Sequence, residues 1–153
     1  MPLSTVGILT RRKALSEHRR LWRTMAVIAQ DVEPTKDEAL QRMGYKKYDV
    51  IAGCFLCEYA RQQRDFFEEG KPCESIAQNG HAFSRNDMCC WCPMKFSNDP
   101  DASTPCLADD SIYKELSDLL EHTYLTTYAK VKDRVVELCR KIAEMPSVRK
   151  CKE

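Results

Sequence analysis

Two closely spaced cysteine pairs are the residues with the clearest chemistry in this sequence. The first is Cys54-Phe-Leu-Cys57, and the second is Cys89-Cys-Trp-Cys92, which is followed by Pro93. Tetrahedral zinc is satisfied by four thiolates at about 2.3 Å, and each pair supplies two of them from one tight turn. The spacing therefore predicts a structural zinc ion bound by Cys54, Cys57, Cys89 and Cys92.

The remaining cysteines leave the ligand set open. Seven of the nine cysteines lie between positions 54 and 106. Cys106 is the substitute ligand, and Cys90 competes with Cys89, although its one-residue spacing to Cys92 fits a single zinc less easily. The four ligands therefore come from Cys54, Cys57, Cys89, Cys90, Cys92 and Cys106. We expect Cys73, Cys139 and Cys151 to be ordinary core cysteines, which are common in proteins.

Three enzymatic interpretations compete with this one and are weaker. A zinc ion saturated by thiolates lacks the open position that a catalytic zinc keeps for water. His81 lies between Asn79 and Asn86, as in HNH-like nucleases, but the sequence has no paired histidine to hold a second metal. A thioredoxin-like redox site needs a strand, helix and strand around the cysteine pair, and no such pattern surrounds Cys54. We therefore expect a protein without enzymatic activity.

Composition sets the class of protein and its compartment. The 153 residues are 43% hydrophobic and 31% charged, and 24 Lys and Arg nearly balance 23 Asp and Glu. These values are typical of one globular domain and exclude a uniformly basic DNA-coating protein. The short apolar stretch 3–9 precedes three basic residues, the reverse of a secretory signal, and no stretch approaches the ~18 apolar residues of a membrane span. We expect a cytoplasmic protein, where clustered cysteines bind metal more often than they form disulfides.

Periodic apolar residues predict a mainly α-helical fold. Helices are expected over 10–30, with Thr10 as N-cap, and from Thr35, where Glu38 completes a capping box and Gly44 offers a left-handed stop. A helical pattern follows the first cysteine pair over 58–69. Two further helices are expected over 111–122 and 126–145, and Pro146 ends the second.

Residues 70–106 have a different character, with four prolines, two glycines and no sustained period. A segment of that length without secondary structure is uncommon in a compact domain unless another interaction orders it, and metal binding would do so. The sequence therefore predicts a single domain over 1–153. Basic N-terminal helices (10–44) and C-terminal helices (110–146) flank an irregular, zinc-bound cysteine-rich segment (50–106).

The first expected helix carries a strong local excess of positive charge. Residues 1–30 contain six basic residues, and Glu17 is their only acid. The exposed arginines of this helix are a candidate partner-binding face, suited to phosphates or to an acidic protein surface. The side chains selected for this face are Arg12, Arg19, Arg20 and Arg23. A separate stripe of Leu138, Ile142 and Met145 fits either a homodimer contact or an internal core.

Four sequence features together resemble small cysteine-rich proteins encoded by phages and prophages. They are the string Cys54-Phe-Leu-Cys57-Glu-Tyr-Ala, the Cys-x-x-Cys-Pro of 89–93, Cys106 with Tyr113, and Lys141-Ile-Ala-Glu-Met-Pro146. The resemblance covers about 50–146, and the 31-residue insert between the cysteine pairs departs from the usual pattern. It implies a viral accessory protein with a structural zinc.

The sequence and this resemblance together favour one function and leave a second open. The favoured function is to bind and modulate or inhibit a host protein or complex in the host cytoplasm, such as a defence or regulatory component. The alternative is a nucleic-acid-binding zinc module that uses the basic N-terminal helix. The family itself supplies no mechanism.

Overall fold

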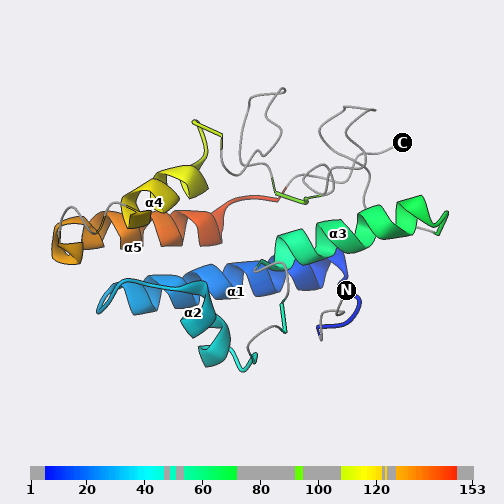
Figure 1. Cartoon of the computed structure of the whole chain (residues 1–153), viewed down its shortest axis with the longest axis horizontal. Coiled ribbons are helices and arrows are strands. Elements are labelled where there is room, and N and C mark those ends of the chain that lie inside the picture. The colour runs from blue at the N-terminus through cyan, green and yellow to red at the C-terminus, as the bar shows by residue number, and fades with distance from the viewer. Residues whose placement is uncertain are drawn as a thin grey trace. The chain divides into compact units, whose positions relative to one another are not determined.

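The computed structural model of this chain describes residues 6–46, 49–50, 54–71, 92–94, 108–121, 123 and 127–147. This part of the chain is mainly helical, as predicted, and β-pairing within it is limited to an isolated bridge between Met94 and Ser147. None of its helices has the length and apolar character needed to span a membrane. The helices are α1 (Arg11–Ala29), α2 (Lys36–Arg42), α3 (Phe55–Glu68), α4 (Ile112–Glu121) and α5 (Tyr128–Glu144) (Figure 1).

The helices begin and end close to the predicted residues. Thr10 Oγ1 accepts a hydrogen bond from the Lys13 backbone N–H at 3.1 Å, and Thr35 Oγ1 accepts one from Glu38 N–H at 3.2 Å. Each hydroxyl satisfies one backbone donor that the first helical turn leaves without a partner. After α2, Gly44 has φ +98°, a conformation that side chains other than glycine rarely adopt. The predicted caps of α1 and α2 are therefore confirmed.

The chain falls into two compact units that interleave along the sequence. Unit 1 comprises Met1–His18, Tyr48–Lys95 and Pro146–Glu153, and unit 2 comprises Arg19–Lys47 and Phe96–Met145. Helix α1 supplies its first eight residues to unit 1 and the remainder to unit 2. The expectation of one domain stays a prediction, and each unit is described by itself below.

Unit 1 is built where α3 meets the segment that leads into α1. Leu9, Ala14 and Tyr59 form a buried cluster against which Val6 packs. The α3 residues Phe55 and Tyr59 have no exposed surface. These two aromatic side chains recur at a four-residue step and so share one face of the helix.

Unit 2 has a core of apolar side chains from four helices. Helix α4 packs beside α5 (Figure 1). The buried residues include Leu21 and Ile28 of α1, Leu40 of α2, Leu116 of α4, and Leu138 and Ile142 of α5. The sequence left open whether the stripe of Leu138, Ile142 and Met145 forms a dimer contact or an internal core. Leu138 and Ile142, two of its three members, lie in the core of their own chain.

Two tyrosines connect the helices of unit 2 through polar contacts. Tyr128 Oη donates to the Ala29 carbonyl at 2.7 Å, and burial raises the pKa of Tyr128 to about 12, which keeps the hydroxyl protonated as a donor. Tyr113 meets buried Trp22 edge to face, with ring centroids 5.8 Å apart. Lys36 Nζ donates to Tyr113 Oη at 2.8 Å and lies 5.8 Å from the Trp22 ring. The three side chains join α1, α2 and α4.

Replacing Ile142 with alanine should lower the free energy of unfolding by about 2–5 kcal/mol, because the buried side chain leaves a cavity. The matched control is Val27→Ala, since Val27 is 56% exposed whereas Ile142 is fully buried. Urea unfolding of both variants checks this. Equal losses at the two positions would contradict the core assignment.

Candidate metal centre

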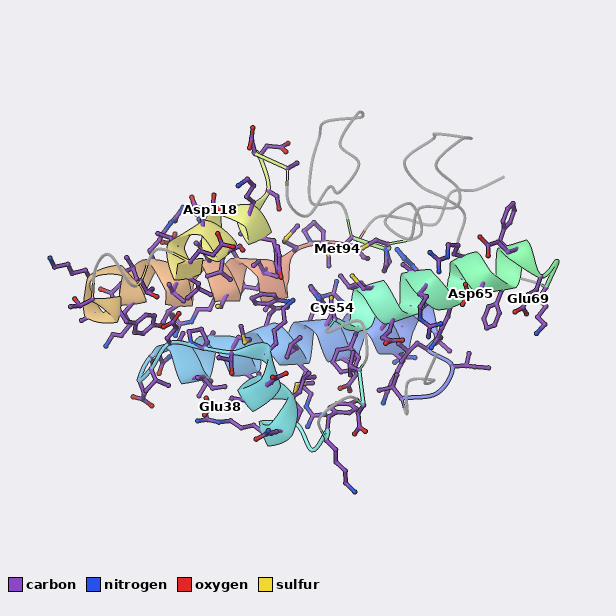
Figure 2. All side chains as sticks on the ribbon, in the orientation of Figure 1. Glu38, Cys54, Asp65, Glu69, Met94 and Asp118 are labelled. Carbon is purple, nitrogen blue, oxygen red and sulfur yellow. The ribbon has the colours of Figure 1, made fainter. Side chains whose placement is uncertain are left out.

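The first cysteine pair lies at the start of α3. Cys54 is the N-cap residue, with extended backbone angles (φ −154°, ψ 134°), and its side chain makes no capping hydrogen bond. Its carbonyl accepts the N–H of Glu58 at 3.0 Å, which closes the first helical turn. Cys57 lies within that turn, and both thiols are half-exposed. Figure 2 shows Cys54 where the helix begins.

This position suits an anionic ligand. The first backbone N–H groups of a helix carry partial positive charge, which stabilises an anion placed beside them. Phe55 and Leu56, between the two cysteines, are 0% and 1% exposed. Because these buried neighbours anchor the turn in the core of unit 1, the two sulfurs are supplied from a fixed piece of backbone.

Cys92 of the second pair lies in the same unit as the first pair. It is half-exposed, and it precedes the buried residues Pro93 and Met94. Met94 forms the isolated bridge with Ser147, which ties this short segment to the chain beyond α5. Three of the predicted ligand cysteines thus belong to one compact unit.

The structure does not assemble a complete ligand set from the residues that it describes. Within these residues, no group of three or more His, Cys, Asp or Glu side chains comes close enough to hold a metal ion. Cys89, Cys90, Cys106 and His81 lie outside the described residues. The donor chemistry of the three described cysteines suits zinc, and the zinc site itself stays a prediction.

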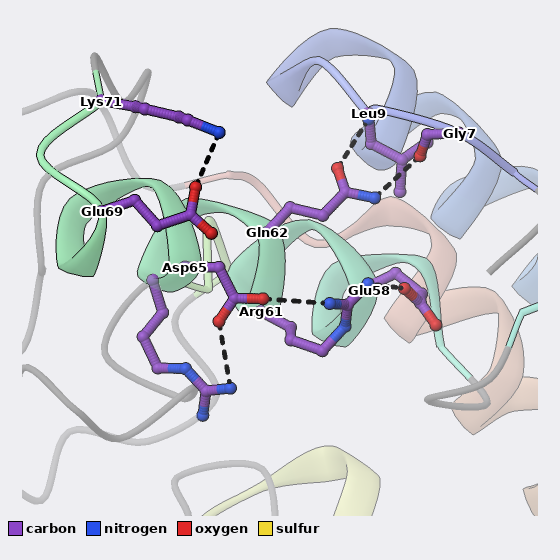
Figure 3. A network of polar contacts seen from close by, with 9 residues as sticks. Gly7, Leu9, Glu58, Arg61, Gln62, Asp65, Glu69 and Lys71 are labelled. Atoms are coloured by element: carbon purple, nitrogen blue, oxygen red, sulfur yellow. Dashed lines mark hydrogen bonds and ion pairs between the residues drawn. The ribbon is translucent and has the colours of Figure 1, made fainter. Parts of the chain in front are cut away.

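A polar network runs along α3 beyond the cysteines (Figure 3). Glu58 is fully buried and pairs with Arg61 at 3.1 Å, and the same guanidinium reaches Asp65 at 3.1 Å. A buried carboxylate is costly unless it is paired in this way. The network therefore balances the charge that Glu58 places directly after Cys57.

Gln62 joins α3 to the N-terminal segment by two hydrogen bonds from one side-chain amide. Its Oε1 accepts from Leu9 N–H at 2.7 Å, and its Nε2 donates to the Gly7 carbonyl at 2.8 Å (Figure 3). The amide thus pairs with one backbone donor, Leu9 N–H, and one backbone acceptor, the Gly7 carbonyl. Sequence reasoning missed this contact, because nothing in the local pattern marks Gln62 as a partner of residues more than fifty positions away.

Cys139 fits its expected role as a core cysteine. Its side chain on α5 is fully buried, and desolvation raises its pKa to about 12. A cysteine that remains a neutral thiol at neutral pH behaves as a small hydrophobic side chain. Cys73 and Cys151, for which the same role is expected, lie outside the described residues.

The four arginines predicted to form a partner-binding face differ in exposure and in their hydrogen-bond partners. Arg12 and Arg23 are exposed on α1, and Arg23 Nε donates to the Arg19 carbonyl of its own helix at 3.2 Å. Arg19 instead donates to the Met145 carbonyl at 3.5 Å, and Arg20 donates to the Met43 carbonyl at 3.3 Å.

Met145 and Met43 are the C-cap residues of α5 and α2. Two adjacent arginines of α1 therefore reach the C-terminal ends of two other helices. Each guanidinium meets a helix end that carries partial negative charge and carbonyls without helical partners. Arg19 and Arg20 consequently have a structural role, whether or not they also contact a partner.

Comparison with family models, curated proteins and solved structures found no match for this chain. The resemblance to phage-encoded cysteine-rich proteins therefore stays a prediction.

Arg19→Glu and Arg20→Glu should each lower the free energy of unfolding by about 1 kcal/mol or more, because a carboxylate would replace a donor at a negatively polarised helix end. Arg23→Glu is the matched control, because Arg23 donates to the Arg19 carbonyl of its own helix. Thermal unfolding followed by circular dichroism compares the three. A loss at Arg23 as large as at Arg19 and Arg20 would show that general charge reversal, not helix capping, sets the stability.

Proposed function

We propose that this chain is a zinc-stabilised binding protein that acts by occupying a macromolecular partner and not by catalysis. The observation that supports it best is the position of Cys54 and Cys57 in the first turn of α3, with Cys92 in the same compact unit. We assign Cys89 as the fourth ligand, with Cys106 as its substitute. Four thiolates would saturate the zinc and leave it a structural role.

The exposed side of α1 is the proposed partner surface. Arg12, Lys13, Arg20 and Arg23 are all exposed there, whereas Glu17 of the same helix is buried. A helix side of this composition attracts an anionic surface through long-range electrostatics. If the resemblance to phage-encoded proteins holds, the partner is a host protein or complex with an acidic surface, such as a defence or regulatory component.

Cys57→Ser should abolish stoichiometric zinc binding and destabilise the protein by several kcal/mol, because the free energy of structural metal binding is also folding free energy. Cys151→Ser is the control for losing one sulfur elsewhere. Elemental analysis of the purified proteins, paired with thermal unfolding, gives both readouts. About one zinc per chain in the parent and in Cys151→Ser is expected. A parent without zinc would remove the central claim.

The exposed basic residues also favour a second candidate, a nucleic-acid-binding module. Contacts between arginine and phosphate release counterions, so affinity should fall steeply as salt rises. Binding of the chain to random-sequence DNA and RNA at several salt concentrations tests this, with Arg12→Gln and Arg23→Gln expected to reduce the steepness. Absence of binding at low salt would exclude nucleic acid and leave a protein partner.

A further inference from the structure

The part of α1 that belongs to unit 2 carries its charges differently from the other helices. Helices α2, α3, α4 and α5 each contain an ion pair between opposite charges three or four residues apart. Arg42 pairs in this way with Glu38 on α2, and Lys114 pairs with Asp118 on α4. Residues 19–30 contain three arginines and no acidic residue. An ion pair of this kind therefore cannot form within this stretch.

The three arginines of this stretch lie close enough to repel one another. Arg23 follows Arg19 by four residues and Arg20 by three, so all three lie on neighbouring turns of one side of the helix. Arg19 and Arg20 each donate to a carbonyl at the end of another helix. Carbonyl contacts leave the positive charges in place. Their neutralisation is left to ions of the solvent or to an anionic partner.

The exposed residues of this stretch form a single row, here called the α1 ridge. The ridge consists of Arg20, Arg23, Val27 and Gln30, which recur at steps of three and four residues and are all exposed. The residues that flank the ridge are buried, namely Leu21, Trp22, Met25, Ala26, Ile28 and Ala29. One side chain per turn, at intervals of about 5.4 Å, is therefore available to a partner.

This ridge suits a protein partner better than it suits nucleic acid. A helix that reads bases enters the major groove, which is about 12 Å wide, with most of its circumference. The buried flanks of the α1 ridge prevent such an entry. Val27 is 56% exposed in the same row as the arginines, and an apolar side chain gains nothing from a phosphate. Protein interfaces, in contrast, combine arginine with apolar side chains.

We infer that the α1 ridge docks along an acidic amphipathic helix of a protein partner. Two carboxylates on adjacent turns of that helix face Arg20 and Arg23, and an apolar side chain one turn further on packs against Val27. A helix matches the ridge because its own side chains recur at the same three- and four-residue steps. The inference rests on the partner-binding role of the proposed function and specifies the partner's chemistry.

Fluorescence anisotropy of the full chain with a labelled peptide tests the inference. The probe is an alanine-rich helical peptide of about 20 residues, with two glutamates three residues apart and a leucine four residues beyond them. A peptide with the same residues in scrambled order and random-sequence DNA are the reference probes. We expect the ordered peptide to bind more tightly than the scrambled one.

Two pairs of variants separate the ridge from other exposed positions. Val27→Ser should weaken binding of the ordered peptide about fivefold or more, because it removes the apolar contact. Val32→Ser is its control, since Val32 is 51% exposed and lies beyond the end of α1. Arg23→Gln should weaken binding about threefold, as expected for one exposed charge pair. Arg140→Gln, at an exposed position of α5, should leave binding unchanged.

The outcomes separate this inference from the proposed function. Binding of DNA without binding of the peptide overturns the inference and supports the nucleic-acid candidate. Equal affinity for the ordered and scrambled peptides, or equal losses at Val27 and Val32, also overturns it, since charge attraction alone then explains the binding. Binding of neither probe overturns the inference and the α1 partner surface together. A chain that binds the ordered peptide but contains no zinc keeps the inference and contradicts the zinc site.

Discussion

The structure depends on one helix that must serve two cores. Helix α1 is continuous from Arg11 to Ala29, and the boundary between the two compact units falls between His18 and Arg19. A helix buries one side along its length, and the buried side of α1 differs between the two units. In unit 1 it includes Glu17 and His18 beside Leu15, and in unit 2 it includes Leu21 and Trp22. Each unit is thus matched to a different part of one element.

The basic side chains of α1 fall into two groups, those that contact the end of another helix and those that do not. Arg19 and Arg20 are adjacent in sequence, yet they reach the C-caps of different helices, α5 and α2. Long basic side chains at helix C-termini interact favourably with the dipole and satisfy terminal carbonyls. Of the four arginines, Arg12 and Arg23 are exposed and take no part in these two contacts, whereas Arg20 is exposed and also reaches the end of α2. A count of basic residues therefore overstates the charge that is available to a partner.

Local features of the fold could be predicted because they depend on nearby residues. The N-cap hydrogen bonds of Thr10 and Thr35 each span three residues, and the end of α5 lies next to Pro146. Contacts that position the helices could not be predicted in this way. Gln62 bonds Leu9 across 53 positions, and Arg19 reaches Met145 across 126. A periodicity of 3.6 residues shows which side of a helix is apolar, and it does not show which distant residues that side contacts.

The candidate metal site shows the same division. The spacing predicted that Cys54 and Cys57 act together as metal ligands, and the structure places both at the start of α3. Which four sulfurs share one ion depends on how distant segments meet. The described residues bring Cys92 into the unit of Cys54 and Cys57 without closing the coordination sphere.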